Sequence, residues 1–321
     1  MNPLIEFIAT AKSYGDMQAL APLDLSISAE QAEIVTIAGE SGSGKSTLAN
    51  LALGFTRPTS GQVLFQGQDI HALSRSERKG LQRNMQAVFQ DPFGVYNPFY
   101  RIQHVFDTVI QNFALTSNAS EAADRIEDAL NRVGLRGADI LRKYPHQLSG
   151  GQRQRIMMAR AYLLKPRLII ADEPVSMVDA SLRASILDVM MSLRDEDGIS
   201  FLYITHDLAT AYQVGDRILL LYQGGVAESG RATEVITRPK HPYVQLLIDS
   251  VPKADPTQRW RGEVSLPAEE SLRSADVRGC RFAPRCPYVT RTCVDVSPAT
   301  IQVAPGHQVN CHRYSDAGER D

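Results

Sequence analysis

The chain has 321 residues, of which 43% are hydrophobic and 22% charged, and its formal net charge is −2. This composition is typical of a globular protein, and a nearly neutral charge gives no electrostatic basis for binding nucleic acid or an anionic membrane surface. No apolar run reaches the roughly 20 residues needed to span a bilayer, and residues 1–6 lack the basic and long apolar regions of a secretory signal. We therefore expect a cytosolic protein that reaches a membrane only through a partner.

The first part of the chain reads as short strands separated by polar turns. Residues 4–8 and 23–27 are predicted strands, and residues 11–15 between them form a polar turn that carries one aromatic, Tyr14. Residues 34–38 are an apolar run of β-branched and small residues, and residues 61–67 are a further strand bounded by glycines.

A glycine-rich loop follows the apolar run 34–38 and precedes a helical pattern at residues 48–53. The loop consists of Gly39, Glu40, Ser41, Gly42, Ser43, Gly44, Lys45, Ser46 and Thr47. It matches the phosphate-loop pattern G-x-x-x-x-G-K-[ST] in its strand–loop–helix context. Glycines allow the backbone to turn its N–H groups inward, and the start of the helix adds positive potential. Lys45 is predicted to contact the β- and γ-phosphates of ATP, and Ser46 to ligate Mg²⁺.

Helical patterns dominate residues 91–165. Ser120 is a candidate N-cap for a helix that ends near Gly134, with an apolar stripe at Ala122, Ile126, Ala129, Leu130 and Val133. A second helix is predicted to begin at Gly150 and to end before Pro166.

Uninterrupted apolar strands return at residues 168–171, 201–204 and 218–221, with a helical pattern at 182–193 between the first two. Such strands are typical of a parallel sheet that is covered on both faces, so the predicted fold class is α/β. Two acids, Asp172 and Glu173, end the first of these strands. Asp172 is predicted to hold Mg²⁺, and Glu173 to orient and deprotonate the attacking water.

A second anion-binding pattern lies at Leu148, Ser149, Gly150, Gly151 and Gln152, at a predicted helix start. One nucleotide does not need two such sites from the same chain, so we predict that this segment closes over ATP held by a second subunit. At this point residues 4–230 resemble the ATP-binding cassette (ABC) transporter ATPases, whose signature is Leu-Ser-Gly-Gly-Gln. The resemblance implies a phosphate-loop NTPase core with a mixed sheet, plus a helical signature subdomain.

The resemblance also implies roles for single residues. Tyr14 would stack on adenine, Gln90 would sense Mg²⁺ and the membrane partner, and His206 would contact the γ-phosphate. Asp179 belongs to a loop that crosses the dimer interface. That loop usually reads Ser-Ala-Leu-Asp in this family, whereas Met177 and Val178 stand in its middle here. Both are apolar, so the departure predicts altered packing rather than lost activity.

The last quarter of the chain differs in composition. Nine of the 17 prolines and all four cysteines lie after residue 235. Residues 238–247 contain His241-Pro242-Tyr243 followed by an apolar helical pattern, and this resembles the extension of oligopeptide, dipeptide and nickel transporter ATPases. We therefore predict a nucleotide-binding domain over 1–234 and a C-terminal extension over 235–321.

The cysteines are Cys280, Cys286, Cys293 and Cys311. A reducing cytosol disfavours disulfides, and the short C-x₂-C pairs of structural zinc sites are absent. Four thiolates suit a [4Fe–4S] cluster, and the resemblance implies one because relatives with a similar cysteine set carry it. A zinc site and cysteines without any metal are the open alternatives.

The sequence thus predicts a subunit that hydrolyses ATP with Mg²⁺ to power an ABC importer of dipeptides or oligopeptides. The resemblance implies a second ATPase subunit, two transmembrane permease subunits and an extracytoplasmic substrate-binding protein as partners, and a peripheral position at the cytoplasmic face of the membrane. Nickel or oligosaccharide uptake remain alternative substrates, and the second ATPase is either a copy or a related chain. A soluble ABC ATPase of DNA repair or translation, or an assembly protein switched by ATP, is the alternative class.

Overall fold

The computed structural model describes residues 3–250 and 278–315. The strands are β1 (Ile5–Tyr14), β2 (Met17–Ile27), β3 (Ile34–Ala38), β4 (Ser60–Phe65), β5 (Gln68–Asp69), β6 (Met85–Val88), β7 (Leu168–Asp172), β8 (Ser200–Thr205), β9 (Arg217–Tyr222), β10 (Gly225–Arg231), β11 (Ile301–Ala304) and β12 (His307–Val309). The α-helices are α1 (Lys45–Ala52), α2 (Arg75–Asn84), α3 (Ile102–Phe113), α4 (Ala119–Arg132), α5 (Gly137–Ile140), α6 (Gly150–Tyr162), α7 (Ala180–Asp197), α8 (Leu208–Val214), α9 (Ala232–Thr237), α10 (Pro242–Asp249) and α12 (Arg291–Asp295), and short 3₁₀ turns lie at Pro145–Gln147, Ala283–Arg285 and His312–Tyr314.

The central sheet has the strand order β11-β12-β10-β9-β3-β8-β7-β6. The strands from β9 to β6 run parallel, whereas β10, β11 and β12 join in antiparallel register. The carboxyl ends of β3 and β7 therefore point to the same edge of the sheet, with β8 between them. This is the edge at which ligands bind in open α/β sheets.

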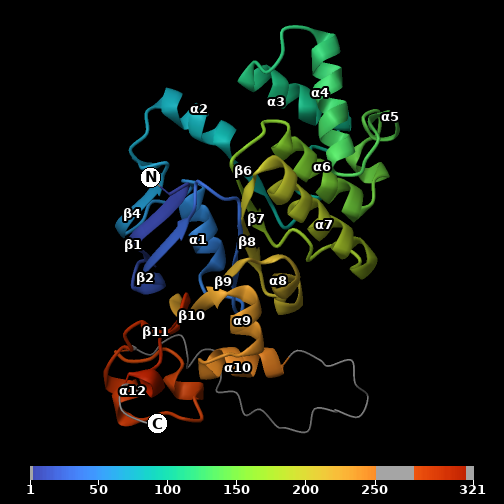
Figure 1. Ribbon diagram of the computed structural model, residues 1–321. Helices are drawn as coiled ribbons and strands as arrows, with labels where there is room; N and C mark the ends of the chain where they lie inside the picture. The colour runs from blue at the N-terminus through green and yellow to red at the C-terminus, as the bar shows by residue number, and fades with distance from the viewer. Residues whose placement is uncertain (1–2, 251–277, 316–321) are drawn as a thin grey trace, which may run out of the picture.

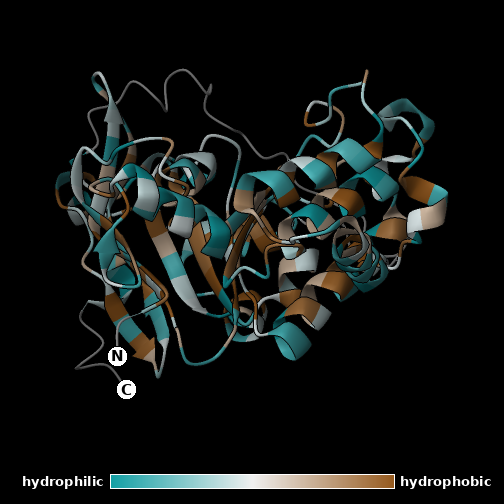
Figure 2. Ribbon diagram, turned by 90° about the horizontal axis from the view of Figure 1, so that it is seen from above, coloured by the Kyte–Doolittle hydropathy of each residue, from teal (hydrophilic) through white to brown (hydrophobic). Residues whose placement is uncertain are grey.

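Two hydrophobic cores cover the two faces of these parallel strands. Alternate residues of each strand divide between them: Ile169 and Phe201 belong to the core formed with α3, α4, α6 and α7, and Ile170 and Leu202 to the core formed with α1 and β2. This period of two is what a buried pleated strand requires. In Figure 1 α1 lies on one side of these strands and α6 and α7 on the other, and Figure 2 shows hydrophobic residues on the central strands between them. The predicted α/β fold is confirmed.

A second, antiparallel sheet with the order β2-β1-β4-β5 packs over α1. Its first hairpin is longer than the sequence predicted, because β1 and β2 pair up to Tyr14 and Met17. The prediction of a polar turn over 11–15 was therefore wrong. The turn is confined to residues 15 and 16, and Gly15 provides its positive φ of 59°.

The helices of the region 91–165 have well-defined starts. Helix α6 begins at Gly150 as predicted, with Ser149 as its N-cap. The predicted cap of α4 was wrong: Asn118 caps this helix by accepting the Glu121 N–H, and Ser120 lies inside its first turn. Both residue types cap helices well, so composition alone did not distinguish them.

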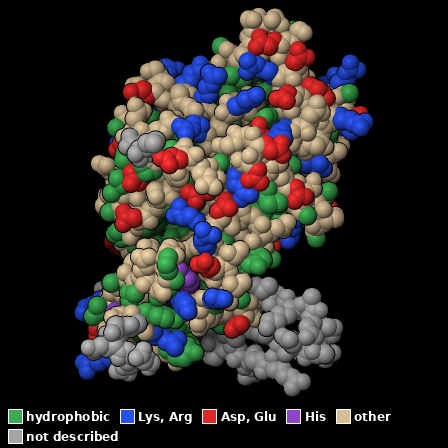
Figure 3. Space-filling model, viewed as in Figure 1, with side chains coloured by type: hydrophobic (Ala, Val, Ile, Leu, Met, Phe, Trp, Pro, Cys, Tyr) green, Lys and Arg blue, Asp and Glu red, His purple; other side chains and the backbone are tan. Residues whose placement is uncertain are grey.

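The segments after residue 235 are joined to the central sheet through a buried acid on β10. Glu228 accepts hydrogen bonds from the backbone N–H groups of Lys240 and His241, and from Nε2 of His307 on β12 at 2.6 Å. Around it, Tyr243 and Phe282 belong to one hydrophobic cluster with residues of α8, β9, β10 and α9. The space-filling view in Figure 3 shows acidic and basic side chains interspersed over the visible face, in keeping with the nearly neutral net charge.

No helix in residues 3–250 and 278–315 is both long and apolar enough to cross a membrane.

Candidate active site

The glycine-rich loop connects β3 to α1 and forms an open turn. Gly39, Gly42 and Gly44 all have positive φ values, of 145°, 76° and 102°. Helix α1 begins without a side-chain cap and has no acidic residue in its first turn. Its first N–H groups and the positive end of its dipole are thus free to bind an anion. Ser41, Gly42 and Ser46 are exposed at the mouth of the loop.

The Lys45 side chain lies inside the loop. Its Nζ donates to the carbonyl oxygens of Gly39 and Glu40, each at 2.8 Å, and the residue is 7% exposed. Burial lowers the pKa of Lys45, and the carboxylates of Glu173, Asp172 and Glu40 oppose this shift. In this poorly solvated site the ammonium group contacts only two neutral carbonyls. Binding of a polyanion would therefore stabilise its charge.

The back wall of the loop is made by segments distant in sequence. A Cβ on Gly39 would clash with the carbonyl of Leu221 at the end of β9, and one on Gly44 with the carbonyl of Ala19 on β2. The Gly224 N–H donates to Ser43 O at 2.9 Å. These contacts were not predicted from the sequence, since nothing in the motif identifies its packing partners.

Glu173 follows β7 and its carboxylate is held from two sides. Gln90 Nε2 donates to Oε2 at 3.0 Å, and His206 Nδ1 lies 2.9 Å from Oε1. The backbone of Glu173 has a φ of 47°, an unfavourable region for a non-glycine residue, and is fixed by a hydrogen bond from its N–H to Ile204 O at 2.9 Å. Strain of this kind is found where a side chain must be aimed in one direction. The structure thus brings together three residues that the sequence predicted for the site.

Asp172 lies at the end of β7, and its carboxylate acts to raise the pKa of Lys45. Burial raises the pKa of Asp172, the Glu173 carboxylate raises it further, and Lys45 opposes both. One carboxylate and the exposed Ser46 hydroxyl suit Mg²⁺, which keeps several waters and binds phosphate oxygens besides one or two protein ligands. These donors therefore fit the predicted metal.

The Leu148–Gln152 segment lies at the start of α6. Ser149 Oγ accepts the Gln152 N–H at 3.2 Å, and Gln152 Oε1 accepts the Ser149 N–H at 3.1 Å, which forms a capping box. Ser149 is exposed. Because α6 and α1 cover opposite faces of the sheet, this helix start does not face the phosphate loop of its own chain (Figure 1).

The loop after Glu173 packs under the start of α6. Val178 is buried beside Gly151, whereas Met177 is 51% exposed. Asp179 is exposed at the N-cap position of α7 and makes no side-chain cap. Tyr14, at the tip of the β1–β2 hairpin, is 46% exposed and has Lys12 Nζ 5.0 Å from its ring centroid. Tyr14 is thus exposed enough for its ring to stack on a base.

The four cysteines are free thiols that line one small pocket in the extension, beside His241 and Arg313. Burial raises the pKa of Cys280, Cys286 and Cys311. Among residues 3–250 and 278–315, no group of three or more Cys, His, Asp or Glu side chains is arranged to hold a metal ion.

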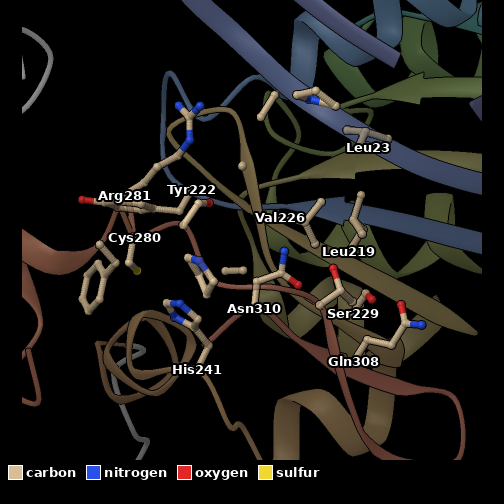
Figure 4. Close-up of a pocket in the computed structure, with 18 of the residues that line it drawn as sticks. Leu23, Leu219, Tyr222, Val226, Ser229, His241, Cys280, Arg281, Gln308 and Asn310 are labelled. Atoms are coloured by element: carbon tan, nitrogen blue, oxygen red, sulfur yellow. The ribbon is translucent and has the colours of Figure 1, made fainter. Parts of the chain in front are cut away.

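A larger pocket of about 630 Å³ lies between the cassette and the extension, away from the phosphate loop. Figure 4 shows Leu23, Leu219 and Val226 from the strands of the sheets, and Cys280 and Arg281 across from Leu23 and Leu219. This pocket contains none of the residues predicted to bind ATP.

Comparison with known proteins gives two matching family models. The model described as ABC transporter matches residues 23–176, and the model described as oligopeptide/dipeptide transporter, C-terminal region, matches residues 227–293.

The curated relatives are similar over nearly their whole length. The chain is 39% identical to the probable peptide ABC transporter ATP-binding protein y4tS of Sinorhizobium fredii, over 90% of this chain and 81% of the relative. It is 38% identical to the oligopeptide transport ATP-binding protein AppF of Bacillus subtilis, over 95% and 92%. It is 35% identical to the dipeptide transport ATP-binding protein DppF of Haemophilus influenzae, over 97% and 96%.

Two solved structures are similar in fold and sequence. CbiO1 from Clostridium perfringens, described as part of the ABC transporter complex cbiONQ, aligns with a TM-score of 0.66 at 26% identity, over 74% of this chain and 92% of CbiO1. The ATP-binding cassette MJ0796, a dimer bound to ADP and phosphate, aligns with a TM-score of 0.62 at 29% identity, over 71% and 98%.

Proposed function

This chain belongs to the ABC transporter ATPases, and from that premise we propose that it binds and hydrolyses ATP to power an importer of dipeptides or oligopeptides. The observation that carries the proposal is the Glu173 carboxylate, held between Gln90 and His206 at the strand edge where the phosphate loop opens. The peptide substrate is supported by the printed names of the relatives and by the matching C-terminal region.

In this proposal the phosphate loop binds the triphosphate of ATP. The loop N–H groups and the start of α1 contact the phosphates, and Lys45 turns from the Gly39 and Glu40 carbonyls to the β- and γ-phosphates. Tyr14 stacks on adenine from the hairpin tip. Ser46, Gln90 and Asp172 would hold Mg²⁺, which supplies charge neutralisation at the phosphates.

Glu173 acts as the general base. The carboxylate takes the proton of a water aligned with the γ-phosphorus, and the hydrogen bond from Gln90 keeps it aimed at that water. His206, whose Nδ1 lies 2.9 Å from Glu173 Oε1, contacts the γ-phosphate in this proposal. The water oxygen bonds to the γ-phosphorus while its proton passes to Glu173, the bond from the γ-phosphorus to the bridging oxygen breaks, and ADP and phosphate are the products.

The site is completed by a second ATPase subunit. The N-terminus of α6, where Ser149 is exposed, covers the nucleotide of the partner with residues 149–152, and Asp179 lies in the loop that crosses the interface. Two cassettes then close head to tail over two ATP molecules and open again after hydrolysis. This cycle is transmitted to two permease subunits at the cytoplasmic face of the membrane, to which a substrate-binding protein delivers the peptide.

The loop after Gln90 supplies a surface for the permeases. Phe99 is 85% exposed and Tyr100 51% exposed, between Gln90 and the start of α3. Exposed aromatic residues in one loop are characteristic of interfaces.

Affinity purification from native membranes tests this function. We expect the chain to bring along two hydrophobic permease subunits, a second ATPase and a substrate-binding protein. Phe99→Ala combined with Tyr100→Ala should abolish recovery of the permeases, whereas Phe55→Ala, which removes another exposed aromatic, should not. Recovery of DNA-repair or translation proteins without permeases would refute the transport function.

We also propose that the four cysteines carry a [4Fe–4S] cluster. Four thiols gathered at one pocket supply the donor set that such a cluster takes, and Arg313 offsets part of its negative charge. Because the thiols are not yet arranged as metal ligands, the cluster would draw them together when it is assembled. The donor chemistry fits, while the geometry is not preformed.

Iron and sulfide analysis of anaerobically purified protein checks this proposal. We expect about four irons and four sulfides per chain with a broad visible absorption, and loss of both in the Cys293→Ser variant. An iron-free, colourless protein that is folded and hydrolyses ATP would refute it, and stoichiometric zinc would favour the alternative metal.

A further inference from the structure

Two side chains from beyond the cassette converge on Glu40, the second residue of the phosphate loop. Tyr243, in the His-Pro-Tyr segment at the start of α10, accepts the Glu40 backbone N–H through its hydroxyl at 2.9 Å. Arg285, in the turn that precedes Cys286, donates through both terminal nitrogens to the Glu40 carboxylate, at 2.9 and 3.1 Å. They are 203 and 245 residues away in sequence.

Glu40 therefore has hydrogen bonds within the phosphate loop and others to residues outside it. Its carbonyl accepts Lys45 Nζ at 2.8 Å and the Ser43 N–H at 3.2 Å, both within the loop. Its N–H and its carboxylate are bound only by Tyr243 and Arg285 among the described residues. When Lys45 turns to the phosphates, the loop loses the first of these internal bonds, while the two external ones are unaffected.

Tyr243 is built into the core and cannot move freely. Its ring is fully buried, 4.6 Å from the Tyr222 ring and 5.7 Å from the Phe282 ring, measured between centroids. Its hydroxyl also points at Leu221 O, at 3.4 Å. A tyrosine hydroxyl is protonated at neutral pH, and burial raises the pKa of Tyr243 further, so the hydroxyl can donate to Leu221 while accepting from Glu40.

Arg285 is similarly fixed. Its side chain is 11% exposed, and its guanidinium carbon lies 5.7 Å from the ring centroids of both Tyr222 and Phe282. A bidentate Arg–carboxylate pair in a partly dehydrated site is stronger and more directional than a surface ion pair. The turn that contains Arg285 is flanked by Phe282 and Cys286, which both line the cysteine pocket. Figure 4 shows Cys280, another residue of that pocket, beside Tyr222.

We propose that Tyr243 and Arg285 are positioning residues that hold Glu40, so that the C-terminal extension keeps the phosphate loop open for ATP. The proposal rests on the proposed ATPase function. Neither residue reaches the phosphates in it; both act through the backbone and carboxylate of Glu40. A change at the cysteine pocket that displaces the 283–285 turn would consequently alter ATP affinity.

Steady-state kinetics and equilibrium binding of ATP test this role in the full chain. Tyr243→Phe removes one hydroxyl and leaves the Glu40 N–H without its acceptor, and Arg285→Ala removes the bidentate pair. Each should raise KM and Kd for ATP about 5-fold, with kcat changed by less than about 2-fold, as expected for one lost hydrogen-bonding partner. Matched controls are Tyr212→Phe, at an exposed tyrosine, and Arg291→Ala, which removes an exposed charge.

A double-mutant cycle separates positioning from general damage. Glu40→Gln and Arg285→Ala should each weaken ATP binding, and the double variant should be no worse than the more affected single variant, because both remove the same pair. Thermal unfolding midpoints identify any variant that is simply less folded, and Tyr243→Phe keeps the buried ring in place.

Three results would overturn the inference: wild-type KM in Tyr243→Phe and Arg285→Ala, equal shifts in the controls, or additive effects in the cycle. In each of them the wild-type protein still binds and hydrolyses ATP. A wild-type protein that fails to bind ATP would instead refute the proposed function, and this inference with it.

Discussion

Glu173→Gln is expected to lower ATP turnover about 1,000-fold, the middle of the range for loss of a general base. The amide has the same shape as the carboxylate, so Gln90 and His206 keep a neighbour, but it cannot accept a proton at neutral pH. ATP affinity should be retained, because no loop contact is removed. Single-turnover hydrolysis with radiolabelled ATP, together with equilibrium binding, measures the two effects separately.

A matched variant for this prediction is Glu234→Gln, which removes an exposed carboxylate on α9. It should hydrolyse ATP at the wild-type rate. Turnover within about 3-fold of wild type in Glu173→Gln would assign the general base to another residue.

Ser149→Arg is expected to reduce turnover about 100-fold without weakening the binding of ATP to the isolated chain. Ser149 is the exposed N-cap of α6, and the bulk of an arginine side chain there would keep the partner's nucleotide away from the helix start. The phosphate loop of the same chain leads into α1, which covers the other face of the sheet, and should be unaffected. The measurement is the comparison of Kd for ATP with kcat.

Ser149→Arg also removes the N-cap of α6, and the loss of an N-cap residue lowers the free energy of unfolding by about 1 kcal/mol. A control variant must therefore lose a similar cap elsewhere in the chain. Ser74→Arg is a close control, because Ser74 also forms a capping box, with Glu77, at the start of α2. It should lose similar stability and keep its turnover. Equal losses of turnover in both variants would show that Ser149 matters for folding alone.

The cassette was largely predictable from the sequence because its signals are local. The strands around residues 168–171, 201–204 and 218–221 are apolar throughout, and the loop from Gly39 to Thr47 carries its glycines at fixed spacing. The edges were less predictable. Lys12 and Ser13 are polar but lie in β1, because they are only half-buried near the exposed tip of the hairpin, where polar residues are tolerated.

What the sequence could not provide were contacts between distant segments. His241-Pro242-Tyr243 was recognisable as a family feature, but nothing in it indicates that the Tyr243 hydroxyl meets the Glu40 N–H. Arg285 was one of several arginines near the cysteines, and its partner lies 245 residues away. The predicted domain boundary near residue 234 stays a prediction, although β12 extends the sheet of the cassette through β10.

The central claim is that each ATP site is shared between two subunits. Light scattering of Glu173→Gln in the presence of Mg²⁺-ATP tests it most directly. The mass should rise from the 35.4 kDa of one chain to twice that value and return when ADP replaces ATP. In the Glu173→Gln/Ser149→Arg double variant ATP should still bind, but the mass should stay at 35.4 kDa. A single-chain mass for ATP-saturated Glu173→Gln, or a double variant that dimerises equally well, would contradict the account.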